Sequence, residues 1–225
     1  MAYYAKKLIV LIFYLTFAHK ISVMSLKRAY IIVILVLLID QISKIYIKTN
    51  FRLEEFVRVF GLDWWQIRFI ENDGMAWGVE IPSYLGGKLT LTLFRIAAVG
   101  GIGWWLYDSV KKKYSNYLIV SIALILAGAF GNIIDSVFYG VIFDHSNGQV
   151  ATLFADEPYG RLFHGRVVDM FYFPIIRNAQ FPAWLPLIGG KTFSFFNAIF
   201  NVADAAISIG MGILIVFNKK AFAKN

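Results

Sequence analysis

Cysteine is missing from the 225-residue sequence. Its absence excludes a disulfide scaffold, a thiol nucleophile and a thiolate-ligated metal. Charged residues are also scarce, at 16% of the chain, whereas a soluble domain usually has about a quarter. Hydrophobic residues make up 59% of the sequence, and its mean hydropathy is +0.63. This composition indicates an integral membrane protein.

Several catalytic motifs are absent as well. The three histidines are His19, His145 and His164, and none of them belongs to the H-E-x-x-H pattern of a zincin. The sequence contains no G-x-S-x-G nucleophile elbow and no Walker loop. Ser43 and Lys44 are neighbours in sequence, but adjacent residues of a helix do not face each other and so do not form a dyad. We expect neither a metal nor another cofactor.

Four apolar windows are long enough to cross a bilayer, which takes about 20 residues. They cover roughly residues 29–47, 89–107, 117–134 and 198–217. A fifth run, at 8–18, has about half the spanning length and is similar in size to the core of a signal peptide, so we expect it not to span. The sequence therefore predicts an all-α membrane protein, a bundle of four transmembrane helices with a small β element.

The net charge of +8 reflects membrane topology, and we expect no nucleic-acid partner. Basic residues gather before the first window, between the second and third, and after the fourth. Because cytoplasmic flanks collect Lys and Arg, both termini are predicted to be cytoplasmic. Residues 1–28 are then a cytoplasmic flank or an upstream extension, 29–217 the four-span domain and 218–225 a basic tail. The two long links, roughly 48–88 and 135–197, are expected to face outward.

The outer links contain strand and interface signals. In the first link, "FVRVF" and "WWQIRFI" flank a Gly/Asp turn, which predicts a β-hairpin lying on the membrane. Trp64, Trp65 and Trp77 suit the interface, either in this sheet or as simple anchors. In the second link, residues 143–165 predict an irregular or short-stranded excursion, and 182–190 are expected to lie along the interface.

Two Asn-x-x-Asp pairs stand at the outer edges of the third and fourth windows. They are Asn132 with Asp135, and Asn201 with Asp204. Charged groups inside or at the edge of a span are costly, so each needs a reason. For the first pair, hydrogen bonds to neighbouring helices or to loop backbone suffice. Asp204 lies about a turn inside its helix, where burial favours the protonated form of a carboxyl and the helix dipole opposes it.

Two further sets of polar residues have structural and functional explanations. Asp40 and Lys44 are four apart on one helix face, and the simpler expectation is a helix-end ion pair oriented toward water. Asp169, between Val168 and Met170, is either an ordinary loop residue or a partner for Asp204. Two carboxylates at one site can divide into an acid and a base and activate water. The residues alone leave both explanations open.

The sequence resembles lipoprotein signal peptidase, also called signal peptidase II, over roughly residues 26–217. Five blocks occur in the order expected for that family. They are "DQISK" at 40–44, "ENDGMAWG" at 71–78, "GAFGNIIDS" at 128–136, "GRVVDMFYF" at 165–173 and "FNVADAAIS" at 200–208.

This resemblance implies a metal-free membrane aspartyl endopeptidase with Asp169 and Asp204 as its catalytic residues. Such an enzyme removes signal peptides from diacylglyceryl-modified prolipoproteins and cuts before the lipidated cysteine. The resemblance also implies a four-helix bundle with an extracytoplasmic β-cradle, whose active site faces outward from the bacterial inner membrane. We expect a monomer whose partners are the lipidated prolipoprotein and membrane lipid. The residues implied to support the site or hold substrate are Asp40, Lys44, Asn72, Asn132, Asp135 and Asn201.

The sequence departs from the family pattern in four places. Ser136 stands where an arginine usually follows the aspartate, and Arg161 or Arg166 are candidates to replace it. The stretch between Asp135 and Asp169 is longer than usual. Trp77 replaces a phenylalanine, and residues 1–23 fall outside the pattern.

Two other functions are consistent with the same residues. In a small transporter or proton channel, Asp40, Asp135 and Asp204 would form a relay across the membrane. In a lipid-binding scaffold without enzymatic activity, the same carboxylates would be structural.

Overall fold

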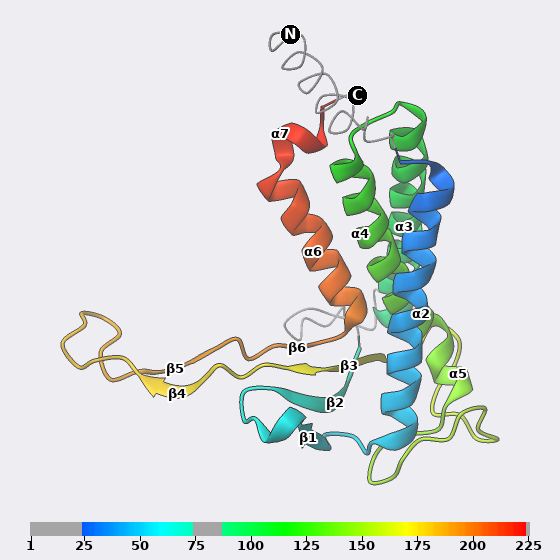
Figure 1. Ribbon diagram of the computed structural model, residues 1–225. Coiled ribbons are helices and arrows are strands. Elements are labelled where there is room, and N and C mark those ends of the chain that lie inside the picture. The colour runs from blue at the N-terminus through cyan, green and yellow to red at the C-terminus, as the bar shows by residue number, and fades with distance from the viewer. Residues whose placement is uncertain (1–23, 74–86, 224–225) are drawn as a thin grey trace, which may run out of the picture.

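The computed structural model describes residues 24–73 and 87–223, and within them four apolar helices form a bundle (Figure 1). These helices are α2 (Leu26–Asn50), α3 (Gly87–Lys111), α4 (Asn116–Ile134) and α6 (Val202–Val216), and the short α7 (Asn218–Ala221) follows. Helix α4 is central and packs against α2, α3 and α6. It reads "AGAFG" where it approaches α6, because small residues let two helix backbones come close.

Among the described residues, three helices are long and apolar enough to cross a membrane: α2, α3, and α4 with its continuation to Ile142. Helix α6 has 15 residues, or about 22 Å at 1.5 Å per residue, against a bilayer core of about 30 Å. The predicted window 198–217 begins too early, because residues 199–200 form a strand and Asn201 caps the helix. A fourth pass therefore stays a prediction. The run at 8–18 lies outside the described residues.

The third helix is longer than expected. The sequence predicted that it would end near Asp135, where the second outer link was expected to begin. The chain instead continues through a π-helical turn, Asp135–Tyr139, into the short helix α5 (Gly140–Ile142). Residues 143–165 then follow an irregular path with two isolated bridges, Arg52↔Val150 and Phe143↔Leu153, which confirms the predicted excursion.

A small antiparallel sheet stands at one end of the bundle. It comprises β1 (Phe56–Arg58), β2 (Gln66–Asn72), β3 (Val167–Tyr172) and β6 (Ile199–Phe200), in that spatial order. The pairing Phe56↔Arg68 confirms the predicted hairpin, whose connection includes the 3₁₀ turn Val59–Gly61. Asp169 lies in the central strand β3 opposite Ile70, and not in a loop. Beyond this sheet, β4 (Ile176–Gln180) and β5 (Thr192–Phe195) form a separate two-stranded ribbon.

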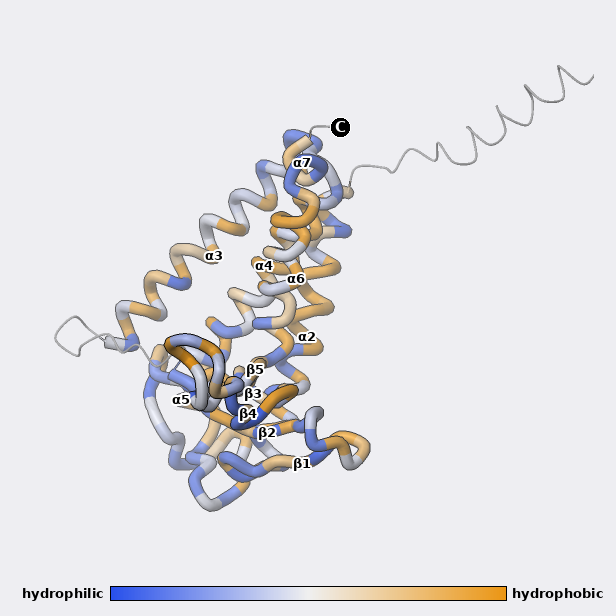
Figure 2. The backbone as a smooth tube through the Cα atoms, turned by 90° about the vertical axis from the view of Figure 1, so that its left-hand side faces the viewer, coloured by the Kyte–Doolittle hydropathy of each residue, from blue (hydrophilic) through white to orange (hydrophobic). Residues whose placement is uncertain are grey.

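The basic segments meet at the opposite end from the sheet (Figure 1). Here the backbone N–H of Met24 donates to Asn116 Oδ1 at 2.7 Å, and Ser115 Oγ donates to the Ala221 carbonyl at 2.8 Å. These bonds join the start of α2, the α3–α4 link and the C-terminal segment. Between the two ends, α2 exposes a belt of large apolar side chains, and Figure 2 shows the mainly hydrophobic colouring of α2, α4 and α6. Both the belt and the clustered basic residues fit a helix bundle placed across a membrane.

A substitution at Gly128 of α4 tests the close approach of α4 and α6. A Cβ at this position would lie 2.2 Å from the Ala203 carbonyl oxygen, so the backbones would have to separate. We expect Gly128→Ala to lower the free energy of unfolding by about 1–3 kcal/mol, as overpacking does. Thermal unfolding in detergent measures the change. Gly101→Ala on α3 is the matched control, because a Cβ there meets nothing within 4 Å. Equal melting temperatures for the two variants would contradict this packing.

Candidate active site

A cavity of about 510 Å³ lies where the sheet meets the bundle. Its walls come from β2, β3, β6 and helices α3, α4 and α6. The polar side chains in these walls are Asn72, Arg95, Asn132, Asp169 and Asp204. The rest of the lining is apolar, so the cavity places two carboxyl groups in a largely hydrophobic setting.

Asp169 is fixed by strand β3 and is 4% exposed. Its Oδ1 accepts a hydrogen bond from Asn201 Nδ2 at 2.7 Å, and its Oδ2 accepts one from Asn72 Nδ2 at 3.3 Å. Burial raises the pKa of Asp169 to about 7, and the nearby charge of Asp204 adds to this rise. Asp169 therefore holds a proton at a pH where an exposed aspartate has lost it.

Asp204 belongs to the first turn of α6, where the Asn-x-x-Asp spacing forms a capping box. Asn201 Oδ1 accepts the backbone N–H of Asp204 at 2.9 Å, and Asp204 Oδ2 accepts the backbone N–H of Asn201 at 3.3 Å. The other oxygen, Oδ1, accepts a hydrogen bond from Asn132 Nδ2 at 2.9 Å. Both oxygens of this carboxylate are thus held by N–H donors.

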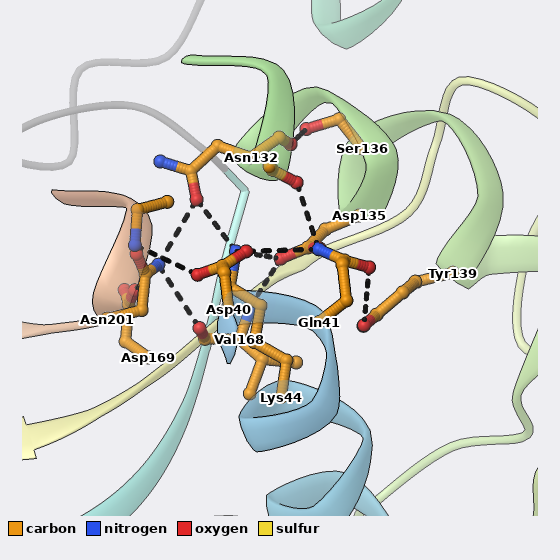
Figure 3. A network of polar contacts seen from close by, with 12 residues as sticks. Asp40, Gln41, Lys44, Asn132, Asp135, Ser136, Tyr139, Val168, Asp169 and Asn201 are labelled. Atoms are coloured by element: carbon orange, nitrogen blue, oxygen red, sulfur yellow. Dashed lines mark hydrogen bonds and ion pairs between the residues drawn. The ribbon is translucent and has the colours of Figure 1, made fainter. Parts of the chain in front are cut away.

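Asn201 joins the two carboxyl groups. Its side-chain amide is fully buried, and Nδ2 contacts Asp169 Oδ1, the Val168 carbonyl at 3.2 Å and Asn132 Oδ1 at 3.2 Å (Figure 3). The same residue caps the helix that carries Asp204. One asparagine therefore fixes β3 and α6 relative to each other. The two Asn-x-x-Asp pairs lie together, as the sequence predicted.

Behind this pair lies a buried ion cluster centred on Lys44. Its Nζ lies 2.9 Å from Asp40 Oδ2 and 2.8 Å from Asp135 Oδ2, and it donates to Asn132 Oδ1 at 2.9 Å. The expectation of a water-facing Asp40–Lys44 pair is wrong, since both side chains are at most 1% exposed. Helix α2 continues to Asn50, so this pair lies in mid-helix and faces α4 and α6.

The carboxylates of the cluster also bind backbone. Asp40 Oδ1 accepts the N–H of Ala203 in the first turn of α6 at 2.9 Å, and Asp135 Oδ2 accepts the N–H of Val168 in β3 at 3.3 Å. For Asp135, this confirms the expected hydrogen bonding to its surroundings. The cluster is therefore attached to the elements that carry both Asp169 and Asp204.

Sequence reasoning did not single out Gln41 or Arg95. Gln41 Nε2 donates to Asp135 Oδ1 at 2.9 Å, and its Oε1 accepts the hydroxyl of Tyr139 at 3.1 Å. It adjoins Asp40 in the "DQISK" block, which was the available signal. Arg95 lines the cavity and carries the charge in an otherwise uncharged window, 89–107, where a cation in a span indicates function.

A second buried cluster holds the long 136–168 stretch. Lys48 is paired with Glu71, donates to Ser146 Oγ at 2.9 Å and lies 5.0 Å from the ring centroid of Tyr159. Arg166 pairs with Glu71 at 3.4 Å. Ser136, at the position of the missing arginine, donates through its Oγ to the Asn132 carbonyl at 2.9 Å and so bonds within its own helix.

Comparisons with known proteins identify the family of the chain. The family model described as signal peptidase (SPase) II matches residues 32–219. A lipoprotein signal peptidase from Porphyromonas gingivalis is 49% identical over 187 residues, which cover 82% of this chain and 80% of the relative. The chain belongs to the signal peptidase II family. A lipoprotein signal peptidase from Amoebophilus asiaticus is 32% identical, with 86% of this chain and 78% of that protein covered.

A solved bacterial membrane enzyme, determined by the in meso method at 2.3 Å resolution, has the same fold as this signal peptidase II family member. The TM-score is 0.56 at 24% identity, and the match covers 86% of this chain and 89% of that one. Family membership does not favour the transporter or the scaffold. The structure also gathers Asp40, Asp135 and Asp204 around one cluster, whereas a relay would distribute them across the membrane.

Lys44→Met tests whether the cluster holds the site together. The change leaves two buried carboxylates without their shared cation, and breaking a buried ion pair on one side costs about 3–5 kcal/mol. We expect a lower melting temperature in detergent and loss of peptidase activity. Lys112→Met is the matched control, because its pair with Asp108 has the same i,i+4 spacing but is exposed. A Lys44→Met protein as stable as this control would contradict a structural role for the cluster.

Proposed function

We propose that the protein is a membrane aspartyl endopeptidase that uses Asp169 and Asp204 as its catalytic pair. Its substrates are prolipoproteins that already bear a diacylglyceryl group, and it cuts just before the lipidated cysteine. The supporting observation is that two carboxyl groups line one cavity and both accept hydrogen bonds from Asn201, Asp169 from its side-chain Nδ2 and Asp204 from its backbone N–H. Its similarity to lipoprotein signal peptidases supplies the substrate class.

The two carboxyl groups act as a general acid and a general base. Asp169 carries the proton at rest, because burial raises its pKa to about 7. Asp204 acts as the base, because it stands in the first turn of α6, where backbone N–H groups favour a negative charge. It takes a proton from water as the water oxygen attacks the scissile carbonyl carbon. Asp169 gives its proton to the carbonyl oxygen, and a gem-diol forms.

Collapse of this intermediate restores both groups. Asp204, now protonated, gives its proton to the amide nitrogen as the carbon–nitrogen bond breaks. Asp169 takes a proton from one diol hydroxyl, which becomes the carbonyl of the new carboxylic acid. The products are the released signal peptide and the lipoprotein with a free amino group. No covalent enzyme intermediate is needed.

The apolar part of the cavity suits the lipid. Ala98 and Val99 of α3, with Ala129 and Ile133 of α4, line it beside the polar residues. Acyl chains pass from the bilayer into such a lining at little cost, because lipid tails are about as apolar as these side chains. The scissile bond then reaches the carboxyl groups while its anchor stays in a membrane-like setting. One chain supplies these lining residues, in keeping with a monomer.

The orientation of the chain in the membrane follows from the distribution of its basic residues. We place the basic end in the cytoplasm and the cavity at the outer face of a bacterial inner membrane, because cytoplasmic flanks collect Lys and Arg. On this assignment both termini are cytoplasmic, and the sheet is the outer cradle above a peptidase domain at 29–217.

Asp169→Asn and Asp204→Asn are each expected to lower kcat/KM by about 10²–10⁴-fold, because each removes one proton-transfer group. Cleavage of a diacylglyceryl-modified precursor by purified enzyme, followed as a gel shift, measures the loss. Asp63→Asn, exposed in the connection between β1 and β2, is the control and should cleave normally. Melting temperatures show whether each variant is folded. A folded single variant with full activity would overturn the pair, and inhibition by a chelator would indicate a metal.

The pH dependence tests which carboxyl group holds the proton. Above about pH 7 Asp169 ionises, so the general acid is lost and kcat/KM should fall as the pH rises. The raised pKa also means that the folded protein binds this proton more tightly than the unfolded chain. Its contribution to stability therefore declines between about pH 4 and pH 7. Initial rates from about pH 5 to pH 9, with melting temperatures alongside, separate the two effects. A flat rate profile through pH 7 would assign the proton elsewhere.

A further inference from the structure

Between β3 and β6 the chain leaves the sheet as a long arm, defined here as residues 174–198. It contains β4, β5 and a tip at 181–191. In Figure 1 the arm extends sideways from the end of the bundle where α6 begins, across the direction of the helix axes. An element in this position runs along the surface of a membrane that surrounds the helices.

The ribbon of β4 and β5 is amphipathic. Directly paired residues share a face, and the pairs Ile176↔Phe195 and Ala179↔Phe193 place four apolar side chains on one side. Ile176 and Ala179 are three residues apart, so a regular strand would put them on opposite faces. A register shift between them, with Asn178 at φ 48°, keeps them together. The other face carries Gln180, Thr192 and Ser194.

The apolar face and the tip are exposed. Phe195 is 56% exposed, and at the tip Trp184 is 78% and Leu187 is 93% exposed. Phe181 stacks on Phe193 with ring centroids 4.3 Å apart, which continues the apolar face toward the tip. Contiguous apolar surface of this kind marks a contact site. In Figure 2, where the arm points toward the viewer, its hydrophobic segments lie beside the sheet end of the bundle.

The charged residues of the arm favour a lipid surface over other binding partners. The charged residues of the arm are Arg177 and Lys191, and it contains no acidic residue. Basic residues beside aromatic and aliphatic side chains match the boundary between anionic headgroups and acyl chains. The exposed tryptophan at the tip fits the same boundary, where such rings accumulate. The exposed apolar belt of α2 continues to Tyr46, toward this end of the bundle, as a helix surrounded by lipid requires.

We propose that the arm binds the membrane surface beside the cavity, with its apolar face and tip in the headgroup–acyl boundary and its two cations on anionic lipid. The arm thereby fixes the height of β3 and β6, which pair at Phe171↔Phe200, relative to the bilayer. This contact is independent of the catalytic assignment, and its test does not use cleavage.

The cysteine-free sequence makes a direct test possible. Leu187→Cys is labelled with an environment-sensitive fluorophore in the full chain, in nanodiscs of phosphatidylethanolamine and phosphatidylglycerol. We expect blue-shifted emission, quenching by lipids brominated near the headgroup, and protection from aqueous iodide. Asn147→Cys, exposed on the 143–165 excursion, is the matched control and should show the reverse pattern. Iodide quenching at position 187 equal to that at 147, without lipid quenching, would overturn the proposal.

Two further comparisons sharpen the result. Quenching at position 187 should weaken when phosphatidylcholine replaces the anionic lipid, and Lys191→Gln should reduce that difference. Equal quenching in both lipids would overturn the role of the cations. Nanodiscs that hold one chain exclude contact with a second copy. A blue shift that appears only in crowded proteoliposomes would assign the arm to a protein interface and overturn lipid binding.

Discussion

The position of the site depends on one buried ammonium group shared by two carboxylates. Lys44 contacts Asp40 and Asp135 inside the bundle, where removing three charges from water costs several kcal/mol for each ion. A buried ion cluster of this kind is therefore weak evidence for stability. Its contribution is to position the elements that its carboxylates bind. Asp40 binds the N–H of Ala203 at the start of α6, and Asp135 binds the N–H of Val168 in β3. The charges hold together the helix and the strand that carry the proposed catalytic groups.

The same geometry gives the two carboxyl groups different surroundings. Asp169 belongs to a strand in the middle of the sheet and is buried there, so burial is the main cause of its raised pKa. Asp204 stands at a helix N-terminus, where backbone N–H groups favour a negative charge. Asn201 donates to both, from its side-chain amide to Asp169 and from its backbone N–H to Asp204. The proposed acid and base are thus the same residue type in two different positions, which is the arrangement that water activation between two aspartates requires.

Much of this was readable from the sequence, and the limits have physical causes. Hydropathy located three spanning helices, and strand-like runs on either side of a Gly/Asp turn located the β1–β2 hairpin, because both signals are local. Hydropathy began the last window at residue 198, but residues 199–200 form a strand because β3 is available to pair. The burial of Lys44 depends on Asp135, which is distant in sequence. The attachment of Ser146 to Lys48 depends likewise on a tertiary contact. Neither the burial of Lys44 nor the contact between Ser146 and Lys48 can be read from composition.

The capping box at Asn201 has a consequence for biosynthesis. Asp204 and the Ala203 N–H both belong to the last apolar helix to leave the ribosome. Until that helix joins the others, the nascent chain contains Asp169 without its counterpart and Asp40 without one of its hydrogen bonds. On the proposed pairing of Asp169 with Asp204, a half-made chain lacks one catalytic group, and hydrolysis begins only after the final helix enters the bundle.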